Sequence, residues 1–158
     1  MRIQALEILF LLAASAAVAS ALPRCSAAPR AAVVRASWTV TPGVLNPAVT
    51  QATIGSTICR RGWTRTVRPP VSYTNALKLK GLRQYLLRGP PSAYQEDHLI
   101  SLELGGDPVD PRNLWPEPYP RASTVDSIEN ELNALVCDGK ISLAEGQRRE
   151  SALKHADG

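Results

Sequence analysis

Two adjacent residues, Asp97 and His98, carry the side chains of this 158-residue chain that are best suited to chemistry. An imidazole exchanges protons near neutral pH and can therefore act as a general base. A carboxylate is an oxygen ligand of the kind that hard divalent cations such as Mg²⁺ prefer. Asn113 follows in the sequence, after the glycine pair Gly105-Gly106. Hydrolysis of a phosphodiester needs a base to deprotonate water and a cation to neutralise the developing charge, and these residue types could supply both.

Each of these residues also has a purely structural interpretation. In a strand, His98 would share one face with Ile100 and Leu102, which is typical of a core histidine bonded to a backbone carbonyl. Asp97 could begin a turn or pair with an arginine, and Asn113 could serve ordinary turn chemistry. Because adjacent strand residues point to opposite faces, Asp97 and His98 can serve one metal only where the strand bends or bulges.

Sequence patterns in the first half of the chain predict three elements that lead to this motif. Asn46-Pro47 favours a helix from Pro47 to about Ser56, because a capping side chain followed by proline is typical of a helix start. Alternation over residues 64–68 predicts a short strand, which ends at a proline pair. Spaced leucines from 77 to 87 predict a helix that Thr74 could cap.

The second half of the chain predicts a hairpin followed by two helices. Alternating apolar residues favour one hairpin arm over 94–104, and the return segment is expected at 113–115. The apolar stripe that includes Val125, Ile128 and Leu132 predicts an amphipathic helix from about Ser123 to Val136. A weaker helix is expected to begin at Ser142. The predicted fold class is therefore α+β, mostly helical, with a small β-hairpin that holds the motif.

The charges are segregated along the sequence. From Cys59 to Arg88 there are eight basic residues and no acidic residue, whereas from Glu96 to Glu150 there are 12 acidic residues and five basic ones. A basic segment beside an acidic one could serve a phosphate backbone and a metal ion respectively. The two segments could equally pair with each other as solvated salt bridges.

The order of strand, glycine pair, asparagine, proline-rich link and helix resembles that of the HNH nucleases, also called His-Me finger nucleases. The string DHLISLELGG over 97–106, followed by RNL over 112–114, is similar to their DH…GG…NL signature. More narrowly, the chain resembles small exported bacterial proteins with an LELGG…RNLWPEP core preceded by RPP.SYTN. That wider similarity runs from about 41 to 147, whereas the part specific to nucleases covers about 94–136. The resemblance implies a ββα finger around one metal ion.

The resemblance also implies roles for individual residues. His98 would be the general base, and Asp97 would be a ligand of a divalent metal ion such as Mg²⁺. Asn113 would either fix the loop under His98 or supply a neutral oxygen to the metal. Basic side chains of the preceding segment would bind the phosphates of a nucleic acid; these are Arg60, Arg61, Arg65, Arg68, Lys78, Lys80 and Arg83.

The helix after the motif departs from the family pattern. HNH nucleases usually place a His or Asn ligand in its first turn, and this chain has no histidine there. The oxygens available on that helix belong to Asp126 and Glu129, so we expect Asp126 to be a metal ligand. A carboxylate in a first turn is also favoured by capping and by the helix dipole, which is the structural alternative for Asp126.

The N-terminus predicts export. The pattern of residues 1–21 is typical of a cleaved signal peptide: Arg2 is followed by an apolar run from Ile8 to Val18 and by small residues up to Ala21. An uncleaved membrane anchor is the alternative. No later segment approaches 18 consecutive apolar residues. We therefore expect a periplasmic or secreted protein that keeps no stable membrane anchor after cleavage.

An exported chain can keep disulfides, and this one has three cysteines. Cys59 and Cys137 lie at the ends of helical patterns, whereas Cys25 lies in a stretch rich in proline, alanine and arginine. We therefore predict a Cys59–Cys137 disulfide with Cys25 left over.

Together these features predict a flexible lead-in over 22–40 and a single domain over 41–158. The function expected from the resemblance is an exported, metal-dependent HNH-type endonuclease that hydrolyses nucleic-acid phosphodiesters. The alternative is a catalytically inactive nuclease-like binding or envelope protein that binds nucleic acid or another polyanion. The sequence leaves open which of the two the protein is, because the third metal ligand is not the usual one.

Overall fold

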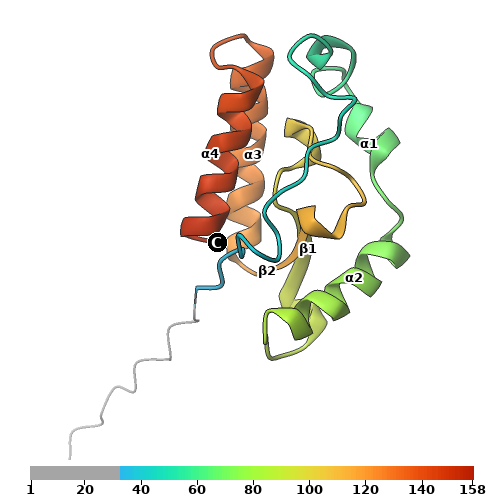
Figure 1. The fold of residues 1–158 in the computed structure, drawn as a ribbon, viewed down its shortest axis with the longest axis vertical. Coiled ribbons are helices and arrows are strands. Elements are labelled where there is room, and N and C mark those ends of the chain that lie inside the picture. The colour runs from blue at the N-terminus through green and yellow to red at the C-terminus, as the bar shows by residue number, and fades with distance from the viewer. Residues whose placement is uncertain (1–32) are drawn as a thin grey trace, which may run out of the picture. The chain divides into compact units, whose positions relative to one another are not determined.

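A β-hairpin separates two groups of helices along the chain (Figure 1). The structure is a computed structural model that describes residues 33–158; the expected signal peptide and Cys25 lie outside these residues. The fold is α+β with a small hairpin, as the sequence predicted, and about half of the described residues are in helices. In chain order the elements are α1 (Trp63–Val67), α2 (Val71–Gln84), β1 (Tyr94–His98), β2 (Leu114–Pro118), α3 (Arg121–Cys137) and α4 (Leu143–Ala156), with single 3-10 turns at Ile54–Ser56, Pro91–Ala93, Leu102–Leu104 and Pro111–Asn113.

The hairpin contacts α2 on one side and α3 on the other (Figure 1). Its strands are antiparallel, with Gln95 opposite Glu117 and Asp97 opposite Trp115. Because side chains alternate along a strand, these four residues share one face of the hairpin. Gln95 on this face donates to Asp126 of α3, and Asp97 accepts from Lys154 of α4. This face of the hairpin therefore points toward α3 and α4.

The loop between the strands is held by the side chain of Asn113. Its Oδ1 accepts from the backbone N of Ile100 at 2.9 Å, and its Nδ2 donates to the Ile100 carbonyl at 3.0 Å. A second donation reaches the Asp107 carbonyl at 3.0 Å. A Cβ on Gly106 would lie 1.8 Å from the Ile100 carbonyl oxygen, so only glycine fits beside this asparagine. The Asn113 amide is thus fully used to shape the loop.

Two hydrophobic clusters form the core. The larger one joins the ends of α3 and α4 to the segments on either side, and includes Val49, Ile58, Ile100, Leu104, Leu132, Val136 and Leu143. The smaller one packs Trp115 against Ala36 and Leu99. Trp115 is completely buried, which identifies it as a packing residue.

The predicted disulfide between Cys59 and Cys137 is confirmed. It joins the segment before α1 to the last residue of α3, with the two Cα atoms 5.5 Å apart and a sequence separation of 78. Ile58, the neighbour of Cys59, is a member of the larger core cluster. The bond therefore fastens an irregular segment to the principal helix of the core.

The helix predicted over 47–56 is wrong. Only Ile54–Ser56 forms a single 3-10 turn, and the preceding residues form turns. The Thr53 hydroxyl donates to the Ala48 carbonyl at 2.8 Å and accepts from the backbone N of Thr50 at 2.8 Å. Such side-chain bonds to the backbone compete with the regular bonds of a helix.

The strand predicted over 64–68 is also wrong, because these residues lie in or directly after the helix α1. The only sheet among the described residues is the β1–β2 pair, so a strand here would have no partner for its backbone groups. A helical turn satisfies those groups within itself. The packing of Trp63 against the larger core cluster favours the same outcome.

The hairpin arm is shorter than the predicted range 94–104. Strand β1 ends at His98, and residues 102–104 form a 3-10 turn. Leu99 and Ile100 are both buried, so the burial does not alternate beyond the strand. The side chain of Asn113 occupies the hydrogen-bonding groups of Ile100 that a longer strand would have paired.

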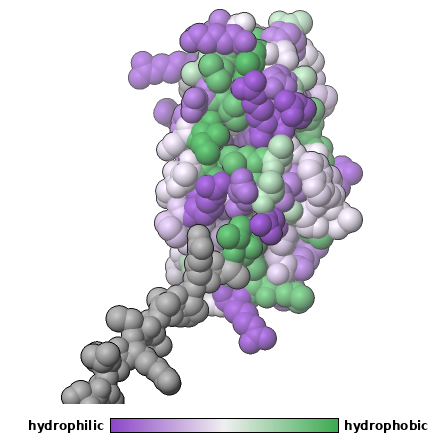
Figure 2. Space-filling model, turned by 90° about the vertical axis from the view of Figure 1, so that its left-hand side faces the viewer, coloured by the Kyte–Doolittle hydropathy of each residue, from purple (hydrophilic) through white to green (hydrophobic). Residues whose placement is uncertain are grey.

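Residues 33–41 contact the C-terminal end of α4. The backbone N of Ala36 donates to the Lys154 carbonyl at 3.0 Å, and the ring of Trp38 stacks on that of His155 with centroids 3.5 Å apart. The face of the molecule on the α4 side has hydrophilic and hydrophobic residues interspersed (Figure 2). Across residues 33–158, no helix has the length and apolar character needed to cross a membrane.

Candidate metal centre

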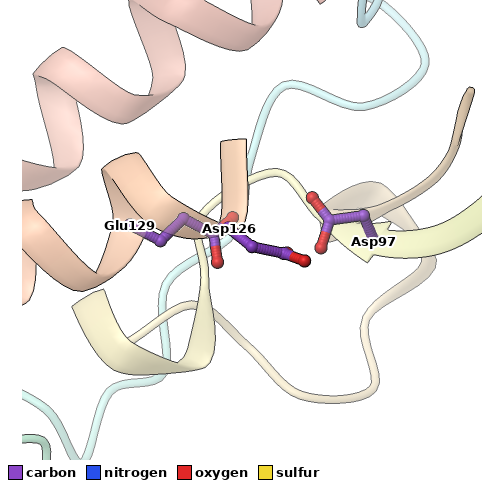
Figure 3. A group of neighbouring side chains, drawn as sticks. All are labelled: Asp97, Asp126 and Glu129. Carbon is purple, nitrogen blue, oxygen red and sulfur yellow. The ribbon is translucent and has the colours of Figure 1, made fainter. Parts of the chain in front are cut away.

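Three carboxylates from two elements converge beside the hairpin. Asp97 is near the end of β1, and Asp126 and Glu129 are one turn apart on the same face of α3. One oxygen from each of the three lies within 4.8 Å of the others. Figure 3 shows Asp97 approaching from the strand while the other two extend from the helix. The structure therefore brings together the two predicted metal ligands, Asp97 and Asp126, and adds Glu129.

A buried lysine from α4 already binds two of these carboxylates. Lys154 is 0% exposed, and its Nζ lies 2.7 Å from Asp97 Oδ2 and 2.6 Å from Glu129 Oε1. A third ion pair reaches Glu150 Oε1 at 3.2 Å, and the ammonium also donates to the His98 carbonyl at 2.5 Å. Every proton of this ammonium thus faces an oxygen.

Two further buried carboxyl groups surround the cluster. Glu150 Oε1 accepts from the backbone N of Ser101 at 2.8 Å, which ties α4 to the loop after β1. Glu117 is completely buried on the same hairpin face as Asp97, and neither of its oxygens has a hydrogen-bond partner among residues 33–158. Three of these five carboxyl groups pair with the one buried ammonium, and the site has an excess of acidic groups over cations.

The environment divides these carboxyl groups by their affinity for protons. Burial acts to raise the pKa of Asp97, but the Lys154 ammonium outweighs this effect and holds that pKa below its ordinary value. Burial raises the pKa of Glu129, against the opposing charge of the Lys154 ammonium that it contacts, and together with the charge of Asp97 it raises the pKa of Glu117 to about 8. Asp97 is therefore ionised at neutral pH, whereas Glu117 retains a proton.

These pKa values predict that the metal-free protein loses stability as the pH rises from 5 to 9. Burial raises the pKa of Glu96 and of Glu117 to about 8 in the folded protein from an ordinary value of 4.5. Between these values the folded state binds more protons than the unfolded state, so alkali favours unfolding. We expect the melting temperature in EDTA to fall by roughly 5 °C or more across this range.

The variant Glu117→Gln tests the origin of that slope. It cannot lose a proton, so its melting temperature should fall less between pH 5 and pH 9 and should exceed that of the unsubstituted protein at pH 9. Thermal unfolding followed by circular dichroism measures both quantities. A melting temperature that rises with pH in both proteins would contradict the assignment of retained protons.

His98 lies beside the carboxylates and points its ring at a backbone carbonyl. Its Nε2 is 3.1 Å from the Pro108 carbonyl oxygen, so the neutral ring donates there and leaves Nδ1 with its lone pair. Burial lowers the pKa of His98, which favours this neutral form. His98 is not one of the three clustered oxygen donors, and the arrangement fits a base more closely than a metal ligand.

A small cavity connects His98 to the carboxylates. It has a volume of about 60 Å³, and its walls include Asp97, His98, Asp126 and Glu129. The exposed residue Arg68, just after α1, forms part of the same wall. Asp97 and His98 both line this cavity although they are adjacent residues of β1.

Asn113 lies under this cavity and not in it. Its Oδ1 accepts from the backbone N of Ile100 and, at 3.4 Å, from that of Val44. Of the two roles that the sequence left open, the geometry corresponds to fixing the loop. The carbonyl of Asn113 itself accepts from the backbone N of Leu99 at 2.8 Å, directly after His98.

The predicted nucleic-acid-binding residues fall into two groups. Arg60, Arg61, Arg65 and Arg68 are exposed in and around α1, and Arg68 lines the cavity. Lys80 and Arg83 are exposed on α2, whereas Lys78 is half-buried and donates to the Tyr94 carbonyl at 3.2 Å. Within residues 33–158, no ion pair joins these seven residues to an acidic residue. The two charged segments do not neutralise each other by direct pairing.

Sequence reasoning missed Lys154, Glu150 and Glu117 as members of the site. A signal for the first two exists in α4, where Leu143, Gly146, Glu150 and Lys154 follow one helical stripe and are all buried. A charged pair that continues an apolar stripe is therefore a candidate for burial. Glu117 gave no such signal, because it stands among prolines without a regular pattern.

Comparison with known proteins gives no independent identification. No protein-family model matches the chain, no curated protein matches it, and no solved structure matches its fold. The functional interpretation therefore depends on the residues of the site itself.

Proposed function

We propose that this protein is an exported, metal-dependent endonuclease of the HNH type that hydrolyses phosphodiester bonds in nucleic acids. The observation that carries the proposal is the shared cavity. A histidine with a free ring nitrogen, three clustered carboxylates and an exposed arginine line one small polar space. These are the groups that phosphodiester hydrolysis needs, namely a base, ligands for a cation and a contact for phosphate.

The donor set fits a hard divalent cation. Asp97, Asp126 and Glu129 offer only oxygens, which Mg²⁺ and Mn²⁺ prefer, and no sulfur or imidazole ligand belongs to the group. Asp126 Oδ1 accepts from the Gln95 amide at 3.2 Å, which leaves Oδ2 as its ligand atom. When bound, such an ion would neutralise charge that develops on the phosphate and on the leaving oxygen.

His98 would take the proton from the attacking water. The Pro108 carbonyl fixes the ring through Nε2, so Nδ1 is the atom available to accept a proton. Asn113 would act as a positioning residue, because it holds the loop that begins directly after His98. Asp97, ionised beside Lys154, would provide a fixed negative charge next to the base.

Nucleic acid would approach over α1. The exposed arginines at 60, 61, 65 and 68 could bind backbone phosphates, and Arg68 reaches the cavity itself. The order of hairpin and helix, β1–β2–α3, is also that of the ββα finger that the sequence motif resembles. We infer that this finger holds the metal between its first strand and its helix.

The test is cleavage of plasmid and single-stranded DNA by the oxidised protein in Mg²⁺, Mn²⁺ or EDTA. We expect cutting only with a divalent cation. Asp126→Asn removes one ligand charge without changing shape, so it should weaken Mn²⁺ binding at least about tenfold and reduce cleavage in parallel. Calorimetric titration with Mn²⁺ measures the affinity, and agarose gels measure the cutting.

Glu131→Gln is the matched control for that experiment. It removes a carboxylate from the same helix, but Glu131 is exposed and lies outside the cluster. Its Mn²⁺ affinity and cleavage should equal those of the unsubstituted protein. Equal losses in the two variants would show that general surface charge, and not the cluster, governs the cation.

A second function is favoured by one specific observation. Lys154 already neutralises part of the acidic cluster, which would permit a nuclease-like fold that binds nucleic acid or another polyanion without catalysis. That protein would bind DNA through the arginines near α1 in EDTA, and binding would weaken steeply with salt. Such binding, from folded protein that shows no cleavage with either cation, would replace the nuclease proposal.

A further inference from the structure

We propose that the buried Lys154 ammonium has two effects on the metal site. It positions Asp97 and Glu129 for the divalent ion, and it lowers the affinity of the site for that ion. Lys154 is then a positioning residue of the site, although it belongs to the last helix of the chain. The inference rests on the proposed function, because it concerns the same metal site.

The contacts of Lys154 join three separate elements. Its ammonium bonds Asp97 of β1 at 2.7 Å and Glu129 of α3 at 2.6 Å, while the residue itself belongs to α4. Two carboxylates that face each other across a gap repel when both are charged. A cation between them removes that repulsion and fixes their separation. The site is therefore assembled before any metal ion arrives.

The same contacts limit how strongly a second cation can bind. Lys154 occupies one oxygen of Asp97 and one of Glu129, so only the other oxygen of each remains for a metal ion. The fixed positive charge also repels a divalent ion within a few ångströms, and burial makes that repulsion stronger than it would be in water. The ion should exchange readily as a result.

Glu150 gives the means to test this without disrupting the fold. It pairs with Lys154 at 3.2 Å and accepts from the backbone of Ser101, but it is not one of the clustered oxygen donors. Glu150→Gln keeps the oxygen for Ser101 and removes one negative charge. The double variant with Lys154→Met removes the positive charge of the ammonium and the negative charge of Glu150 together, so the net charge of the cluster is unchanged.

The experiment measures Mn²⁺ affinity by the electron paramagnetic resonance signal of free Mn²⁺, using the full oxidised protein. Relative to the unsubstituted protein, the double variant should bind Mn²⁺ at least about tenfold more tightly, because two carboxylate oxygens become free and the repelling charge is gone. The affinity of Glu150→Gln alone for Mn²⁺ should be at least about threefold lower, because the ammonium remains and one negative charge that compensates it is lost.

A second readout is thermal unfolding in EDTA and in Mn²⁺. In EDTA the double variant should have a lower melting temperature than the unsubstituted protein. The increase in melting temperature on adding Mn²⁺ should be larger for the double variant than for the unsubstituted protein. A purely structural lysine would lower the melting temperature equally in both conditions and leave the Mn²⁺ affinity unchanged, and that result would overturn the inference.

The outcomes also separate this inference from the proposed function. If the unsubstituted protein binds Mn²⁺ and Asp126→Asn weakens the binding as expected, the site exists, and an unchanged affinity in Glu150→Gln then overturns the role of Lys154 alone. That single variant decides the matter even if the double variant does not fold. Failure of the unsubstituted protein to bind Mn²⁺ would overturn the metal site and this inference together.

Discussion

Replacing His98 with alanine is expected to lower the single-turnover rate constant of metal-dependent DNA cleavage by roughly a hundred- to ten-thousandfold while the protein stays folded. The ring is the only imidazole that lines the cavity of Asp97, Asp126 and Glu129, so no other imidazole in its wall could replace it as the base. Its loss removes one hydrogen bond, to the Pro108 carbonyl, from a loop that Asn113 holds independently. Single-turnover cleavage at saturating Mg²⁺ measures the effect, and circular dichroism establishes that the variant is folded.

Rescue by free imidazole distinguishes a base from a merely structural histidine. The alanine variant leaves space for a small ring beside the carboxylates, and added imidazole should restore part of the activity in proportion to its concentration. The affinity for Mn²⁺ should stay within about threefold, because His98 is not among the clustered oxygen donors. A folded variant that cleaves at the original rate would remove His98 from the mechanism.

Removing the disulfide is expected to cost roughly 4 kcal/mol of unfolding free energy, which is the largest stability effect that the structure predicts. The bond closes a segment of 78 residues, and in the chain-entropy model a long loop gains the most from closure. Against a total stability of about 5–15 kcal/mol for a domain of this size, that loss is at least about a quarter of the whole. Urea unfolding of the Cys59→Ala, Cys137→Ala double variant measures it.

The matched control is Cys25→Ala, which removes the cysteine that the sequence leaves outside this pair. Its urea midpoint should equal that of the unsubstituted protein under oxidising conditions. A reducing agent should lower the midpoint of both by the same amount and leave the double variant unchanged. A loss below about 1 kcal/mol in the double variant would show that core packing alone fixes the segment before α1.

Some parts of the structure follow directly from the sequence. The apolar stripe of the helix after the motif predicted α3 almost to its ends, because a period of 3.6 residues is a property of the local backbone. Ser142 and Glu145 predicted the start of α4, and the Ser142 hydroxyl accepts from the backbone N of Glu145 at 3.2 Å. The cysteine pair was also predicted correctly, although the segment before Cys59 is not the helix that the pattern predicted.

The choice of Asp97, His98 and Asp126 as candidates came from their residue types together with the resemblance to the HNH motif, and the structure places all three on one cavity. Chemistry restricts such choices, since few residue types can accept a proton or bind a hard cation. Spacing restricts them further, because the motif lies on a strand and Asp126 lies in the helix that follows it.

Other parts were decided only by tertiary structure. Residues 64–68 alternate like a strand but form α1, because no neighbouring strand is present to pair with them. The strand β1 stops at His98 because the side chain of Asn113, distant in sequence, takes the backbone groups of Ile100. An alternating pattern describes one segment alone and contains no information about its partner.

The ionic centre of the site depends on tertiary structure most of all. Lys154 and Glu150 look like an ordinary exposed pair four residues apart on a helix, yet both are completely buried against Asp97 and Glu129. Local sequence determines where each helix forms and which of its side chains share a face. The packing of α4 against α3 and the hairpin decides whether a charged face of the helix meets water or the carboxylates of another element. The free energy of burying Lys154 therefore depends on Glu129 and Asp97, which are 25 and 57 residues away in the sequence.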